Sequence, residues 1–80
     1  MEIVTVQFWK EWLHGYSGRN YTYRTTLHLR VGDRVLAPTA KGDRQKAIVT
    51  QIGLPESVID PSWADQVKTI TEMDRGEVPV

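Results

Sequence analysis

Apolar and polar side chains alternate with a period of two in two stretches of this sequence, and this feature constrains the fold more than any other. In residues 2–8, Val4, Val6 and Phe8 share one parity, and Thr5 and Gln7 lie between them. In residues 21–30 the two parities are Tyr21, Tyr23, Thr25, Leu27 and Leu29 against Thr22, Arg24, Thr26, His28 and Arg30. Successive side chains of a strand point to opposite faces, so both stretches are predicted as strands with one buried face.

Three further segments are predicted as strands. Arg34–Ala37 follows a tight turn at residues 31–33, where Gly32 supplies the backbone freedom, and it ends at Pro38, which cannot donate to a sheet. Residues 39–43 are predicted as a loop and residues 45–54 as the strand after it. This strand is apolar on both faces near Ala47–Val49, which predicts a central or strongly curved position. Residues 67–73, rich in threonine and β-branched side chains, are predicted as the last strand.

The connections between these strands are less constrained. Residues 9–20 form either a long loop or a hairpin, and the alternation does not decide whether residues 9–13 are strand or helix. Residues 55–66 are predicted as a loop with one short helical turn at 61–65 and with Ile59 and Trp63 as apolar anchors. Residues 74–80 are predicted as a flexible C-terminal tail.

Five short strands in 80 residues are near the lower limit of what one hydrophobic core holds together. A sheet this small has to protect its edges, and closure into a barrel does so. We therefore expect an all-β domain over residues 1–73, a five-stranded SH3-like barrel with one helical turn before the last strand. An OB-like barrel is the alternative.

The composition excludes several classes of protein and site. With no cysteine, the chain has no disulfide framework, no thiolate metal site and no cysteine nucleophile. Its longest apolar runs are two or three residues, which is too short for a transmembrane helix or a signal peptide. The expected location is the cytoplasm.

Charge is unevenly distributed along a chain whose formal net charge is zero. Residues 10–46 hold eight basic and three acidic side chains, whereas residues 47–80 hold two basic and six acidic ones. The first segment is therefore +5 and the second −4. Either the two segments neutralise each other in the fold, or a local field attracts a partner.

Residues 29–38, LRVGDRVLAP, resemble the turn and strand that open many small barrels, among them the amino-terminal DNA-binding domain of the primosomal replication-restart helicase. Over residues 20–73 the chain resembles small uncharacterised phage and prophage proteins. The second resemblance implies a viral or prophage origin and, with it, the cytoplasm of the host cell.

Catalysis has little support in the sequence. His14 lies beside a glycine, His28 lies on the outward parity of a strand, and neither has a partner at metal-ligand spacing. Asp60 and Asp65 are typical of caps and solvated loop charges, and Asp33 is expected to bond the amides of its turn. We expect a protein that is not an enzyme and needs no cofactor or metal.

Protein binding is the favoured function, because three tryptophans are many for a core of this size. The predicted surface centres on Trp9, Trp12 and Tyr16 and is edged by Arg19 and Arg24. Its expected partner is a host or phage protein, or a second copy of the chain, so that the protein acts as an adaptor or inhibitor.

Nucleic-acid binding is the alternative function. A strand face and the hairpin after it carry six cations that attract phosphate without reading sequence. These are Arg24, Arg30, Arg34, Lys41, Arg44 and Lys46.

Overall fold

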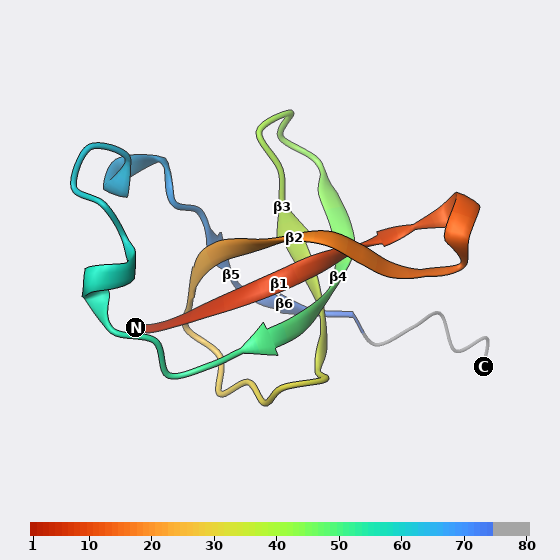
Figure 1. Ribbon diagram of the computed structural model, residues 1–80, viewed down its shortest axis with the longest axis horizontal. Coiled ribbons are helices and arrows are strands. Elements are labelled where there is room, and N and C mark those ends of the chain that lie inside the picture. The colour runs from red at the N-terminus through yellow and green to blue at the C-terminus, as the bar shows by residue number, and fades with distance from the viewer. Residues whose placement is uncertain (75–80) are drawn as a thin grey trace.

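The computed structural model describes residues 1–74, which are all-β with three short 3-10 helices (Figure 1). The strands are β1 Glu2–Lys10, β2 Gly15–Thr25, β3 Arg34–Pro38, β4 Arg44–Gln51, β5 Thr69–Ile70 and β6 Glu72–Met73. The 3-10 helices are η1 Glu11–Leu13, η2 Glu56–Val58 and η3 Ala64–Gln66. In this described part of the chain, no helix is long and apolar enough to cross a membrane. Apart from Asp74, the predicted C-terminal tail lies outside the described residues.

The strands form one six-stranded sheet in the order β5-β2-β1-β4-β3-β6, which confirms the all-β prediction but not a closed barrel of five strands. The predicted last strand is divided at Thr71. Its first half, β5, pairs parallel with β2, and its second half, β6, pairs antiparallel with β3. The predicted last strand thus makes two pairs of two residues each, one on either side of Thr71.

The core lies on the parity that the alternation predicts. Val4 and Val6 are 0% exposed and Phe8 is 9% exposed. Side chains from the other strands and from the β2–β3 connection complete the same cluster: Tyr23, Leu29, Val35, Ala37, Ala47, Val49 and Ile70. The inner face of the sheet therefore closes around β-branched and aromatic side chains.

β1 is also buried on its second face, which the alternation does not predict. It lies between β2 and β4, and Ile3 and Thr5 are 2% and 7% exposed. The segment after β4 crosses Ile3, where the Leu54 N–H donates to the Ile3 carbonyl oxygen at 3.1 Å. The Thr5 hydroxyl lies 2.8 Å from the Thr50 hydroxyl, so its burial leaves it hydrogen-bonded.

β2 is shorter at its end than predicted. It stops at Thr25, whose hydroxyl oxygen accepts the Leu27 N–H at 3.0 Å, and this local bond competes with continuation of the strand. Leu29 is nevertheless buried, but it reaches the core from the connection to β3. The prediction that Arg24 and Arg30 share one strand face is therefore wrong, because Arg30 lies in the turn before β3.

Residues 9–20 form a hairpin that extends away from the rest of the sheet, with η1 at its end (Figure 1). Residues 9 and 10 belong to β1, and residues 11–13 are 3-10 helix. A bulge follows, because the register changes from Val6 opposite Tyr21 to Phe8 opposite Ser17. The extra residues include Gly18, whose φ of 97° suits glycine.

The connections after β2 and β4 follow the predictions in part. The turn at residues 31–33 is present: the Asp33 N–H donates to the Arg30 carbonyl, and the Asp33 carboxylate accepts the Arg30 N–H at 2.9 Å. The predicted helical turn at 61–65 is confirmed in part, since residues 61–63 form a turn that leads into η3 at Ala64–Gln66, whereas η2 was not predicted. Ile59 is an anchor at 5% exposure, whereas Trp63 is 36% exposed.

Candidate binding surfaces

The hairpin tip, residues 9–16, brings three of the predicted protein-binding aromatics together. Trp9 lies opposite Tyr16 in the β1–β2 register, and their rings meet edge to face with centroids 5.2 Å apart. The Trp9 Nε1–H donates to the Glu11 carboxylate at 2.6 Å. Trp12 and Leu13 then project from η1 with 79% and 46% of their surface exposed. The tip is thus an ordered pair of rings that carries two uncovered apolar side chains.

Arg24 does not border this tip. It lies opposite Ile3, whereas Trp9 lies opposite Tyr16, and six residues of strand between them span about 20 Å. Its guanidinium donates to both carboxylate oxygens of Glu56, at 2.5 and 3.2 Å. This hydrogen bond lowers the pKa of Glu56 and raises that of Arg24. Arg24 therefore ties β2 to η2.

The six cations predicted for nucleic-acid binding are not equivalent. Arg44 forms an ion pair with Glu72, and Arg24 pairs with Glu56. Both pairs join the basic segment to the acidic one, so the two segments partly neutralise each other. The remaining cations are exposed: Arg30, Arg34, Lys41 and Lys46. Arg34 and Lys46 lie on the paired strands β3 and β4.

A groove of about 760 Å³ opens at one end of the sheet interior, and sequence reasoning missed it. Its walls come from the β1–β2 hairpin, the β3–β4 turn and the segment around η3. Its apolar lining includes Tyr21, Tyr23 and Trp63. Tyr21 has the inward parity that was predicted, opposite Val6, yet it is 46% exposed because it lies where the interior meets the groove.

Four basic side chains line this groove, which we call the cationic groove: Lys10, Arg19, Lys41 and Lys68. Among the described residues 1–74, Asp43 is the one acidic residue in its lining, and its carboxylate accepts the Thr39 hydroxyl hydrogen. Burial raises the pKa of Tyr23, whose hydroxyl donates to the Pro38 carbonyl oxygen at 2.7 Å. The alternation predicted that Tyr21 and Tyr23 face the interior of the sheet. No local sequence signal predicts that Lys41 and Lys68 line the same groove.

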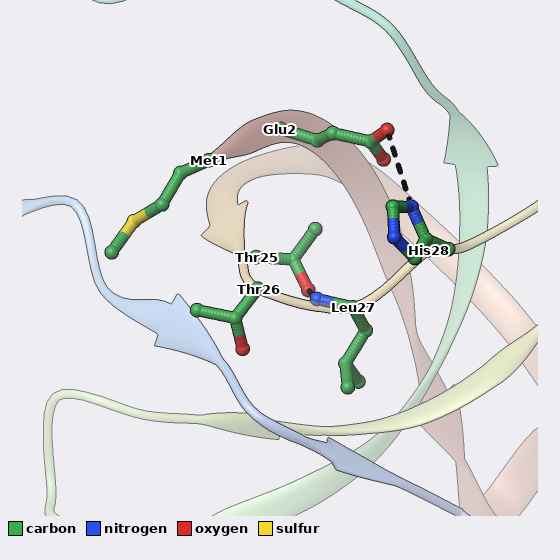
Figure 2. Close-up of a pocket in the computed structure, with 6 residues that line it drawn as sticks. All are labelled: Met1, Glu2, Thr25, Thr26, Leu27 and His28. Carbon is green, nitrogen blue, oxygen red and sulfur yellow. Dashed lines mark hydrogen bonds and ion pairs between the residues drawn. The ribbon is translucent and has the colours of Figure 1, made fainter.

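A second hollow, of about 390 Å³, lies between the start of β1 and the end of β2 (Figure 2). Here His28 Nδ1 is 4.0 Å from a Glu2 carboxylate oxygen, and the His28 side chain is 99% exposed. The Thr25 hydroxyl beside them donates to the Ile70 carbonyl and accepts the Leu27 N–H. A hydroxyl engaged in this way is not an activated nucleophile, and no residue among 1–74 holds the His28 imidazole toward it.

His14, the second histidine, lies at the end of η1 with a positive φ of 49° and is exposed. Its N–H donates to the Glu11 carbonyl oxygen at 3.2 Å, which closes the single helical turn. Among residues 1–74, no three histidine or acidic side chains gather as metal ligands.

Comparison of the chain with protein-family models, with curated proteins and with solved structures gave no match.

Proposed function

We propose that this chain is a small, non-enzymatic binding protein of the phage type, which docks on a host or phage protein through its hairpin tip. As an adaptor or inhibitor, it works in the cytoplasm of the host cell. The phage-type assignment rests on the resemblance of residues 20–73 to small phage and prophage proteins.

One observation carries the proposal: Trp12 is 79% exposed at the end of a hairpin that extends from the sheet. Tryptophan is strongly enriched among the residues that dominate protein interfaces, because its large surface is buried on binding at a low cost in side-chain entropy. Leu13, 46% exposed, adds apolar area beside it. Leaving both in water has a hydrophobic cost that a protein partner removes.

The base of the tip supports the proposal because it is pre-ordered. The ring pair of Trp9 and Tyr16 and the Trp9–Glu11 hydrogen bond hold η1 in place before any partner arrives. Less conformational entropy is then lost on binding. Arg19 lies within the same hairpin and is exposed, so it can edge the interface, whereas Arg24 is committed to Glu56.

The SH3-like architecture is part of the proposal. Its support is that β5 and β6 are separated by Thr71 alone while they pair with β2 and β3, at opposite edges of the sheet. The apolar tip remains the surface that we propose for the partner.

The test is affinity capture from a lysate of the host cell after nuclease treatment. The bait is the unaltered chain, a Trp12→Ser/Leu13→Ser variant, or a Val31→Ser variant as a matched control, because Val31 is 62% exposed but lies in the turn before β3. We expect one protein to be retained by the unaltered and Val31 baits and lost with the tip variant. Equal retention by the tip variant, or retention of no protein by the unaltered chain, contradicts the proposal.

Self-association through the tip is measured separately. Sedimentation of the unaltered chain over a range of concentrations shows whether a dimer forms, and the tip variant shows whether Trp12 and Leu13 hold it together. A dimer that persists in that variant uses another surface.

A further inference from the structure

The cationic groove has an excess of positive charge that no ion pair within residues 1–74 neutralises. Its lining holds four basic side chains and one acidic one. Neither the lysines nor Arg19 form an ion pair with any residue in the part of the chain that the structure describes. By contrast, Arg24 and Arg44, outside the groove, are both paired. Several unpaired cations around one hollow attract a polyanion and release its counterions.

The same groove exposes aromatic rings, which an ordinary solvated basic surface does not. Tyr21 is 46% and Trp63 is 36% exposed, and both line the groove. The Tyr21 ring is held against Phe8, with centroids 5.1 Å apart, so it is a supported ring rather than a mobile one. Exposed rings interleaved with cations are the combination that binds bases by stacking and phosphates by charge.

We propose that the cationic groove binds single-stranded nucleic acid without sequence preference. Lys10, Arg19, Lys41 and Lys68 contact the phosphates, and Tyr21 and Trp63 stack on bases. A duplex hides its bases from such rings, and the described part of the chain has no helix longer than three residues to enter a major groove. An acidic peptide would use the cations but leave the rings without a stacking partner.

The cationic groove shares Lys10 and Arg19 with the hairpin of the proposed function but has a different centre. Trp12 and Leu13 do not line it, and Lys41 alone is shared with the cation set predicted from the sequence. The two proposals therefore fail independently: the tip variant removes one site, and groove variants remove the other.

The experiment is fluorescence anisotropy with a labelled 20-nucleotide poly-dT strand, titrated with the protein at several salt concentrations. With three or four phosphate contacts, a plot of log affinity against log salt should have a slope of about −2 to −3. A labelled duplex and poly-glutamate of similar charge are the comparison ligands, and both are expected to bind at least tenfold more weakly.

Variants locate the site. Lys41→Ala/Lys68→Ala should weaken poly-dT binding about tenfold at low salt and reduce the slope by about 1.4, since each phosphate contact contributes about 0.7. The matched control, Arg34→Ala/Lys46→Ala, removes two exposed cations of the β3–β4 pair that do not line the groove, and should leave affinity within about twofold.

The aromatic contribution is tested at Tyr21 with a conservative pair. Tyr21→Phe keeps the ring and its packing on Phe8 and should bind as the unaltered chain does. Tyr21→Leu keeps an apolar side chain but removes stacking, and should bind about fivefold or more weakly. Thermal unfolding confirms that each variant is folded. Absence of salt-dependent poly-dT binding, equal binding of poly-glutamate, or a larger effect from Arg34→Ala/Lys46→Ala would overturn the proposal.

Discussion

One buried hydroxyl joins β2 to β5, and its removal tests how the ends of the sheet are held. Thr25 is 1% exposed, and its Oγ1 donates to the Ile70 carbonyl oxygen at 2.9 Å and accepts the Leu27 N–H at 3.0 Å. Thr25→Val keeps the volume and the branched Cβ but removes this partner from both backbone groups. The change therefore isolates the hydrogen bonds from the packing.

The expected magnitude follows from those two groups. A buried polar group that loses its partner costs about 1–3 kcal/mol, and Leu27 is only half-buried, so its amide contributes at the lower end. We expect the free energy of unfolding to fall by about 2–4 kcal/mol. A domain of this length has a total of about 4–12 kcal/mol, and Tm should fall by about 10–25 °C.

Urea unfolding followed by tryptophan fluorescence measures this loss. Thr22→Val is the matched control, because Thr22 is half-buried on the same strand and its hydroxyl makes no hydrogen bond within residues 1–74; it should change stability by less than about 0.5 kcal/mol. Thr25→Ser retains the hydroxyl and should keep a larger part of the stability than Thr25→Val. If Thr25→Val is as stable as the Thr22 control, the hydroxyl does not join the strands as described.

Three other perturbations test single features of the fold. Gly32→Ala should cost about 1–2 kcal/mol in urea unfolding, because Gly32 has a φ of 96° although a Cβ there meets no atom within 4 Å; an unchanged midpoint would argue against that backbone conformation. Glu56→Gln should make the free energy of unfolding depend less on pH in acid. The hydrogen bond from Arg24 lowers the pKa of Glu56, so the stability that this carboxylate contributes is present above the ordinary glutamate pKa of about 4.3 and is lost as pH falls through the lowered pKa. Parallel stability curves between about pH 5 and pH 2 for the two chains would refute it. Tyr23→Phe should cost about 1 kcal/mol at neutral pH by removing the bond to the Pro38 carbonyl. It should also remove an alkaline dependence, because burial raises the pKa of Tyr23 and the stability it contributes below about pH 10 is lost as pH rises through that raised pKa; a variant that keeps the dependence would disprove this.

The strands were predictable because a period of two is a local property. Val4, Val6 and Phe8 are buried as their parity requires, and Asp33 bonds its turn as its chemistry suggests. The end of β2 was not predictable in this way. The parity continues to Arg30, but the hydroxyl of Thr25 bonds the Leu27 N–H and turns the chain out of the strand.

The candidate site residues also differ in how far the sequence could predict their arrangement. Trp9, Trp12 and Tyr16 are close in sequence, so a hairpin that joins them was within reach of local reasoning. Arg24 and Glu56 are 32 residues apart, and their pairing depends on how η2 packs against β2. From the sequence alone, Arg24 was predicted as a cation available to a partner. The structure shows that its guanidinium is paired with the Glu56 carboxylate.

By itself, the sequence determined the parity of the core and the places where the chain must turn, because side-chain alternation and glycine or proline conformations are decided within a few residues. Only the tertiary structure decided which charges are neutralised, how the last strand divides at Thr71 between the two edges of the sheet, and that Lys10, Lys41 and Lys68 face one groove with Tyr21 and Trp63. These arrangements depend on contacts between residues far apart in the chain, and such contacts are selected by the packing of the whole sheet rather than by any single segment.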